Sequence, residues 1–198
     1  EIVSFLSRRG SAVTVISNGH RLDDATTENL IRRGVGLFEL PLLSWRREIH
    51  DELSGCSGAF DAALAAIANI RHHGGKVVTV FMATRRNLPD LYDTLKLAFG
   101  FGADGVMLNR FNPGGRGAAY IQDLLPSAAE MRQALEVAER AREEFHLPIA
   151  CSIPIQPCLI DMASYPHLSY GFCAAGSDRA YYTLDTAGNV RPCNHTST

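Results

Sequence analysis

The stretch KVVTVFMA, residues Lys76–Ala83, decides the fold class of this 198-residue chain. Its apolar residues run almost without interruption, as in a strand that is buried on both faces of a parallel sheet. The segment before it, 59–72, has apolar residues at helical spacing, and the segment after it, 88–99, is also predicted to be helical. A buried strand between two helices indicates a β–α repeat.

The same alternation extends in both directions along the chain. Short strands enriched in apolar residues are predicted at 12–17, 36–43, 105–109 and 148–153, and further helices at 23–33 and 127–145. Five strands are too few for a closed eight-stranded barrel. We therefore predict an α/β fold, a partial (β/α) TIM-like barrel or open sheet of parallel strands with helices outside it.

The pattern changes beyond about residue 165, where glycine, tyrosine and polar residues dominate. Residues 180–184 and 189–191 alternate around the turn sequence Asp185-Thr-Ala-Gly188, which predicts a β-hairpin. We expect a partial barrel over residues 1–155. A linker and the start of a second, smaller unit are expected over residues 156–198.

Composition excludes several classes of protein. The net charge is −2, with 19 basic and 21 acidic residues, so neither nucleic acid nor a membrane surface is expected as a partner. No apolar run approaches the roughly 20 residues of a membrane-spanning helix, and no targeting segment opens the chain, so we expect a cytoplasmic protein. Five cysteines, an odd number, do not resemble a secreted disulfide scaffold.

Two of these cysteines bracket the predicted hairpin. Cys173 precedes it, Gly188 lies in its turn and Cys193 follows it. A hairpin can bring two distant thiolates to one metal centre, and soft thiolates select iron–sulfur clusters or zinc. A zinc site built from these cysteines and His195 is the competing interpretation.

The spacing of Cys173, Gly188 and Cys193 resembles the opening of the SPASM or twitch extension of radical S-adenosylmethionine enzymes. Upstream segments agree, since Ser17-Asn18-Gly19 resembles the end of that family's third strand. The passages HDELSGCSGAF (50–60) and NRFNPGGRG (109–117) resemble two of its loops. The resemblance covers residues 10 to 193 and identifies 1–155 as the barrel from about the third strand onward.

The chain departs from the family pattern in two places. No three of its cysteines have the CxxxCxxC spacing that ligates the radical-generating 4Fe–4S cluster, so we expect an internal fragment that is inactive by itself. Pro41 occupies the strand position where many relatives have a serine that helps to bind the cofactor, which weakens the case for cofactor contacts from this strand.

The resemblance implies an oxidoreductase or maturase that cleaves S-adenosylmethionine to a 5′-deoxyadenosyl radical, which abstracts hydrogen from a small-molecule or peptide substrate. It also implies 4Fe–4S clusters and an electron donor such as flavodoxin or ferredoxin. Cys173 and Cys193 are the candidate cluster ligands. Ser17, Asn18, Asn109 and Arg110 follow strand ends and are the candidate cofactor-binding residues.

Two alternatives stay open. The chain fits a degenerate, non-catalytic barrel that binds a peptide or partner, and it also fits a zinc-containing α/β enzyme. For the candidate residues themselves, Asn18-Gly19 is also a common turn pair, and Arg110 also suits an ordinary ion pair on the surface.

Overall fold

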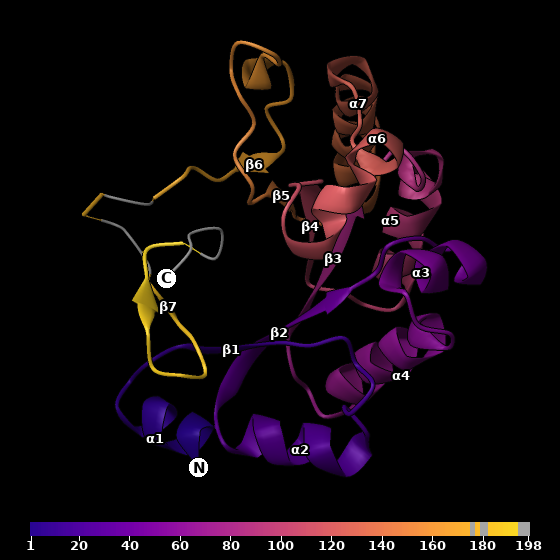
Figure 1. Cartoon of the computed structure of the whole chain (residues 1–198). Helices are drawn as coiled ribbons and strands as arrows, with labels where there is room; N and C mark the ends of the chain where they lie inside the picture. Colours follow the sequence, from indigo (N-terminus) through magenta and orange to yellow (C-terminus); the bar gives the residue numbers. More distant parts are fainter. Residues whose placement is uncertain (175–176, 179–181, 194–198) are drawn as a thin grey trace.

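The computed structural model describes residues 1–174, 177–178 and 182–193. Six parallel strands form one sheet in the order β1-β2-β3-β4-β5-β6 (Figure 1). Their bounds are β1 Val13–Ile16, β2 Val35–Pro41, β3 Val77–Ala83, β4 Gly105–Arg110, β5 Ile149–Cys151 and β6 Ser169–Tyr170. Strands that follow one another in space as they do in sequence are typical of a barrel segment, because every right-handed crossover then lies on the same side.

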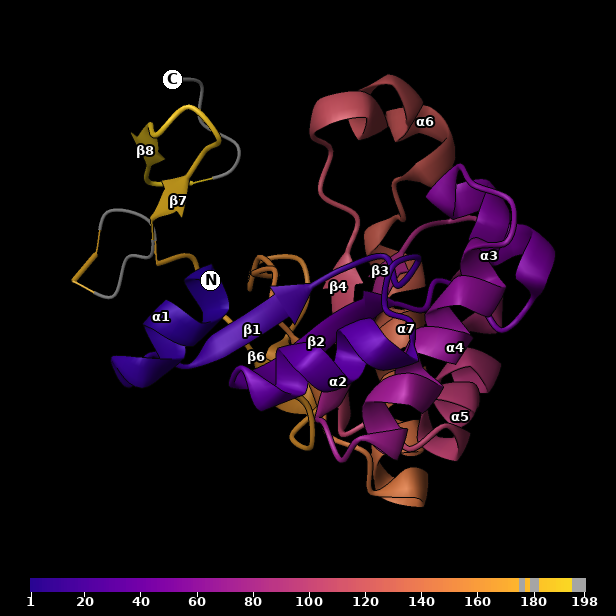
Figure 2. The same cartoon turned by 90° about the horizontal axis from the view of Figure 1, so that it is seen from below.

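The helices confirm this one-sided winding. Figures 1 and 2 show α4, α5 and α7 following one another along one side of the sheet. The helices are α1 Ile2–Arg8, α2 Asp24–Arg32, α3 Arg47–Ser54, α4 Ala59–His72, α5 Leu91–Gly100, α6 Ile121–Leu124 and α7 Ala128–Phe145, with 3-10 turns η1 Leu88–Asp90, η2 Gly115–Tyr120 and η3 Met162–Ser164.

The core lies between the sheet and these helices. Alternate strand residues, such as Phe38, Phe81 and Leu108, are fully or almost fully buried there. Leu135 and Ile67 contribute from α7 and α4. The burial explains why β3 has a nearly continuous apolar sequence, because its core face must pack against helices while its other face lines the inside of the barrel segment.

Local sequence signals set the ends of the elements. The Asp23 carboxylate accepts a hydrogen bond from the Thr26 N–H at 2.8 Å and caps α2. Ser127 and Glu130 form a capping box at the start of α7. Gly19 has φ +87°, and a Cβ added there would lie 3.0 Å from the Ala62 carbonyl oxygen, so this turn requires glycine.

Most of the predicted elements are confirmed, and the differences are local. The helix α3, over Arg47–Ser54, was not predicted, and the helix expected at 88–99 begins with a 3-10 turn. The short strand β6 was not predicted from the sequence. It joins the sheet because Ala150 and Cys151 of β5 pair with Ser169 and Tyr170, a long-range contact that no local pattern signals.

The predicted hairpin is present as a separate antiparallel pair, β7 (Thr183–Leu184) and β8 (Val190–Arg191). The Asp185 carboxylate accepts hydrogen bonds from the backbone N–H groups of Ala187 and Asn189, both at 2.9 Å. The Asn189 side-chain amide also donates to this carboxylate, at 3.0 Å, and this bond together with those from the backbone holds the pKa of Asp185 below its usual value. Gly188 in the turn has φ +91°.

In the described residues, no single helix has both the length and the apolar character needed to cross a bilayer. Among the helices that the structure describes, α3 and α4 taken together pass that test, and the chain bends by 100° between them. The division of the chain near residue 155 stays a prediction.

Candidate active site

The inner face of the barrel segment is mostly apolar. The strand register places the side chains of alternate residues there, side by side across four strands. Examples are Ile16, Glu39, Val78 and Met82. Because the helices cover only the other face, these residues are half-buried or exposed; Ile16 is 76% exposed.

Glu39 is a carboxylate on this face, opposite Ile16 of β1 and Val78 of β3. Partial burial among apolar neighbours raises the pKa of Glu39, because the charged form loses hydration. A charged residue in the middle of the apolar strand GLFELPLL is the signal that sequence reasoning passed over.

A cavity of about 680 Å³ opens where β2, β3 and β4 end. Apolar residues make up much of its lining, and its polar groups include Glu52, Thr84 and Arg116. Arg116 has no ion-pair partner among the residues that the structure describes. The lining residues are Leu43, Glu52, Leu53, Ser54, Gly55, Met82, Thr84, Phe111, Arg116, Gly117, Tyr120 and Leu124. Ligand sites of parallel β/α folds lie at this edge of the sheet.

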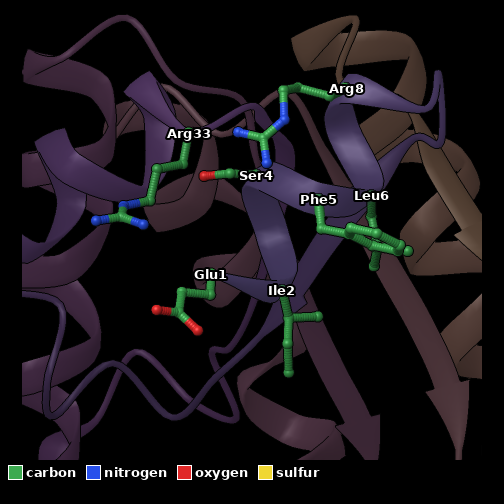
Figure 3. A pocket seen from close by; sticks show the side chains of 7 residues that line it. All are labelled: Glu1, Ile2, Ser4, Phe5, Leu6, Arg8 and Arg33. Carbon is green, nitrogen blue, oxygen red and sulfur yellow. The ribbon is translucent and has the colours of Figure 1, made fainter.

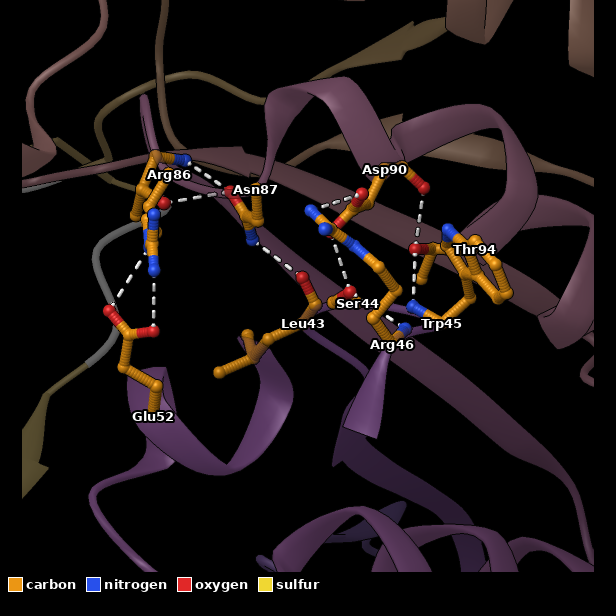
Figure 4. A network of polar contacts seen from close by, with 10 residues as sticks. Leu43, Ser44, Trp45, Arg46, Glu52, Arg86, Asn87, Asp90 and Thr94 are labelled. Carbon is orange, nitrogen blue, oxygen red and sulfur yellow. Dashed lines mark hydrogen bonds and ion pairs between the residues drawn. The ribbon is translucent and has the colours of Figure 1, made fainter. Parts of the chain in front are cut away.

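Asn87 holds this edge together (Figure 4). It is fully buried, and its amide oxygen accepts hydrogen bonds from the N–H and the hydroxyl of Thr84, both at 2.8 Å. Its amide nitrogen donates to the carbonyl oxygens of Leu43 at 2.6 Å and Met82 at 3.0 Å. The Asn87 side chain therefore joins the segment after β2 to the end of β3. Its three partners, Leu43, Met82 and Thr84, all line the cavity.

Two further groups of polar contacts, around Asp90 and between Arg86 and Glu52, lie near the same edge of the sheet (Figure 4). The almost fully buried carboxylate of Asp90 accepts a hydrogen bond from the Ser44 hydroxyl at 2.7 Å and pairs with Arg46 at 2.8 Å. Arg86 and Glu52 form a two-point ion pair at 2.9 and 3.1 Å. The Asp90 contacts fix the loop after β2 against the start of α5, and the Arg86–Glu52 pair joins the loop after β3 to α3.

The candidate residues Ser17 and Asn18 lie at the end of β1, where their side chains form local turns. The Ser17 hydroxyl accepts a bond from the Gly19 N–H at 3.1 Å, and the Asn18 amide oxygen accepts one from the His20 N–H at 3.3 Å. In this same turn region the His20 Nε2 lies 3.6 Å from the Cys56 thiol. The turn-forming interpretation of Asn18-Gly19 is therefore present in the structure.

The candidate residues Asn109 and Arg110 lie at the end of β4, which is separated from β1 by the two strands β2 and β3. The Asn109 amide oxygen accepts hydrogen bonds from the Ser152 N–H at 3.0 Å and hydroxyl at 2.8 Å. Arg110 donates to the Pro154 carbonyl oxygen at 2.8 Å and has no carboxylate partner among the described residues. These side chains thus brace the segment after β5. The structure places all four candidates on one edge, but none lines the cavity.

His50 lies in α3 and has a structural role. It is fully buried, and its Nδ1 accepts a hydrogen bond from the Leu43 N–H at 3.1 Å. Burial lowers its pKa, so the neutral ring is favoured. Cys151 is a core residue, and burial raises the pKa of its thiol to about 12.

The candidate cluster ligands lie on either side of the β7–β8 hairpin. Cys173 is exposed and Cys193 is half-buried, and no disulfide joins any of the cysteines in the described residues. His195, the third residue of the alternative zinc site, lies outside the described residues.

A second cavity, of about 720 Å³, lies at the other edge of the sheet (Figure 3). It is lined by α1 and by Arg33, which precedes the start of β2. The cavity lies near the starts of β1 and β2 and not near the carboxyl ends of strands. In this architecture the catalytic groups are carried by the loops that follow those carboxyl ends.

No protein-family model matches the chain. The mycofactocin maturase MftC of Mycolicibacterium smegmatis is 29% identical over 136 residues, covering 67% of this chain and 34% of that protein. A PqqA peptide cyclase of Granulibacter bethesdensis is 23% identical over 200 residues, covering 100% of this chain and 51% of that protein. The chain therefore spans from about a third to about half of the length of these relatives.

The crystal structure of Streptococcus suis SuiB bound to S-adenosylmethionine matches 98% of this chain and 45% of that chain, with a TM-score of 0.74 and 14% identity. At that identity the likeness shows the fold. The curated relatives and the motifs above support the predicted resemblance: they place the chain with the radical S-adenosylmethionine superfamily, among maturases of the SPASM type.

The residues present fit the implied iron–sulfur groups only in part. Cys173 precedes the hairpin in the sequence and Cys193 follows it, and cysteine sulfur is the ligand type that holds an iron–sulfur cluster. The five cysteines include no CxxxCxxC set, so these residues do not fit the cluster that reduces S-adenosylmethionine. We assign no step of that reduction to them.

Proposed function

We propose that the whole protein is a radical S-adenosylmethionine enzyme that modifies a peptide. The apolar inner face, which ends in a cavity of about 680 Å³ at the carboxyl edge of the strands, is the observation that carries this proposal. A reactive radical needs a site that excludes water and competing hydrogen donors. The relatives whose names describe a peptide cyclase and a maturase, and the SuiB structure bound to precursor peptide SuiA, support a peptide substrate.

In this proposal the cofactor supplies one-electron chemistry that ends in hydrogen abstraction, and the chain's own residues position the substrate. Arg116 is the unpaired cation of the cavity, so we propose that it binds a carboxylate of the peptide. Met82 and Phe111 provide apolar walls for the reacting side chain. Glu39 lies beside this region, on the inner face of β2.

Ser17, Asn18, Asn109 and Arg110 stay proposed cofactor contacts. They lie at the carboxyl ends of β1 and β4, with the ends of β2 and β3 between them. A ligand that lies along this edge of the sheet would reach both pairs of residues. Equilibrium dialysis of S-adenosylmethionine against the whole protein tests this assignment. We expect Arg110→Met to weaken binding at least tenfold, and unchanged affinity would remove Arg110 from the site.

We also propose that Cys173 and Cys193 ligate an auxiliary 4Fe–4S cluster, and that a flavodoxin or ferredoxin provides electrons. The test is the iron and sulfide content of the anaerobically purified whole protein. Cys173→Ala with Cys193→Ala should remove about four iron ions per protein. Cys56→Ser, which changes another exposed cysteine, is the matched control and should remove none.

Activity provides the decisive test. The whole protein, supplied with S-adenosylmethionine, a reductant and a precursor peptide, should form 5′-deoxyadenosine and a peptide of altered mass. Arg116→Gln should raise KM for the peptide, with a smaller effect on kcat. The 198-residue chain alone should be inactive. A whole protein that binds peptide but never forms 5′-deoxyadenosine would instead support the degenerate scaffold.

A further inference from the structure

Two histidines and an aspartate meet where α4 ends and α2 begins. His72 is the last residue of α4, His73 is its C-cap and Asp24 is the first residue of α2. One ligand atom from each lies within 4.8 Å of the other two. The His73 Nε2 is 2.8 Å from a carboxylate oxygen of Asp24, and the two imidazole rings lie 4.9 Å apart.

Rigid elements hold these three residues in place. The Asn69 side chain of α4 donates a hydrogen bond to the Leu22 carbonyl oxygen at 2.9 Å, two residues before Asp24. Gly19 packs closely on α4 at Ala62, so the segment that leads to α2 follows α4 along its length. Figures 1 and 2 show α2 beside α4. The side chains are therefore brought together by tertiary packing, and little ordering remains for a ligand to impose.

The donor set has a definite chemistry. Two imidazoles and one carboxylate are ligands that zinc and other borderline divalent ions prefer, at about 2.0–2.2 Å. Ligand atoms within 4.8 Å of one another need only small side-chain rotations to reach one ion, which would replace the direct contact between His73 and Asp24. A fourth position stays open to water.

The surrounding charges permit a cation. The C-terminal end of the 14-residue helix α4 carries the negative end of its dipole. The nearest cation along the chain, Arg71, is paired with Asp104 at 3.1 Å. The N-terminal end of α2 carries the positive end of that helix's dipole, which disfavours a cation. The carboxylates of Asp23 and Asp24 offset this positive charge. Asp23 is already bonded to the Thr26 N–H, which leaves Asp24 for the metal.

We propose that Asp24, His72 and His73 form a binding site for a divalent ion such as Zn²⁺, which joins α2 to α4. The site lies before the start of β3, at the opposite edge of the sheet from the candidate active site. Its role is structural, because binding there stabilises the folded chain without contact with substrate or cofactor.

Titration of the chain with Co²⁺, a spectroscopic substitute for Zn²⁺, tests the proposal. Exposed thiols are first alkylated under native conditions, because Co²⁺ bound to cysteine gives an intense sulfur-to-metal absorption. We expect one Co²⁺ per chain, with ligand-field bands and no sulfur-to-metal band. Zn²⁺ should displace it and raise Tm by several degrees, roughly the shift expected for a ligand in large excess over its Kd.

Three variants make the result specific. His72→Asn and Asp24→Asn change exposed ligands, and each should weaken Co²⁺ binding at least tenfold and abolish the rise in Tm. His146→Asn is the control, since it removes an exposed histidine at a left-handed position that asparagine tolerates. Equal urea midpoints without metal show that the variants fold. Unchanged Co²⁺ affinity in His72→Asn and Asp24→Asn would overturn the proposal, as would binding that disappears when thiols are blocked.

Discussion

Asn87→Ala is the most informative perturbation of this fold, because a single buried amide joins two strand ends. The substitution removes four hydrogen bonds, two to Thr84 and one each to the carbonyl oxygens of Leu43 and Met82. A net value of about 1 kcal/mol for each gives a loss of about 4 kcal/mol. That is a large part of the roughly 5–15 kcal/mol that stabilises a typical domain.

Urea unfolding of the chain, followed by circular dichroism, measures this loss. Asn29→Ala is the matched control, because Asn29 makes one exposed bond to Arg33 and should cost within about 0.5 kcal/mol. The reasoning also predicts a local effect on the cavity. Leu43, Met82 and Thr84 line it and all three bond to Asn87, so peptide binding by the whole protein should weaken as well. A loss below about 1 kcal/mol for Asn87→Ala would refute the view that this amide organises the edge.

Three further predictions concern stability. Burial raises the folded-state pKa of Glu39, so its protonated form supports folding at low pH, and that support is lost as pH rises through the raised pKa. The Tm of Glu39→Gln should therefore rise relative to that of the unmodified chain as pH increases. A Tm difference that does not change with pH would contradict this. Ser127→Ala breaks the capping box with Glu130 and should lower the free energy of unfolding in urea by about 1 kcal/mol. Gly19→Ala should lower the free energy of unfolding by about 1–2 kcal/mol because of the left-handed φ alone, and by more because the new Cβ contacts the Ala62 carbonyl oxygen. An unchanged urea midpoint would contradict this prediction.

The arrangement of polar groups explains how a half-open sheet can carry a defined site. The inner face has few polar side chains, whereas the edge where the strands end is held by buried amide and carboxylate contacts. Asn87 and Asp90 come from the loop and helix after β3, and Asn109 comes from β4. Each bonds to a neighbouring segment, so the edge is shaped by side chains that face the protein, while Arg116 faces the cavity.

Sequence alone determined the features that depend on neighbouring residues. Short apolar runs located β1 to β5 and helical spacing of apolar residues located the long helices, because burial imposes its pattern on the local sequence. The same holds for the capping box at Ser127 and for the hairpin with Gly188 in its turn. The cysteines at 173 and 193 likewise indicated the family through their spacing around that glycine.

Only the tertiary structure decided what depends on residues far apart in the chain. Strand register put Glu39 on the inner face, and packing buried Asn87 between two strand ends; neither follows from local periodicity. The candidates Asn109 and Arg110 proved to brace the segment after β5. Asp24 lies 49 residues before His73, and they meet only because α2 packs on α4. Such contacts arise when the chain folds back on itself, so a sequence pattern records the elements but not which of their polar side chains will meet.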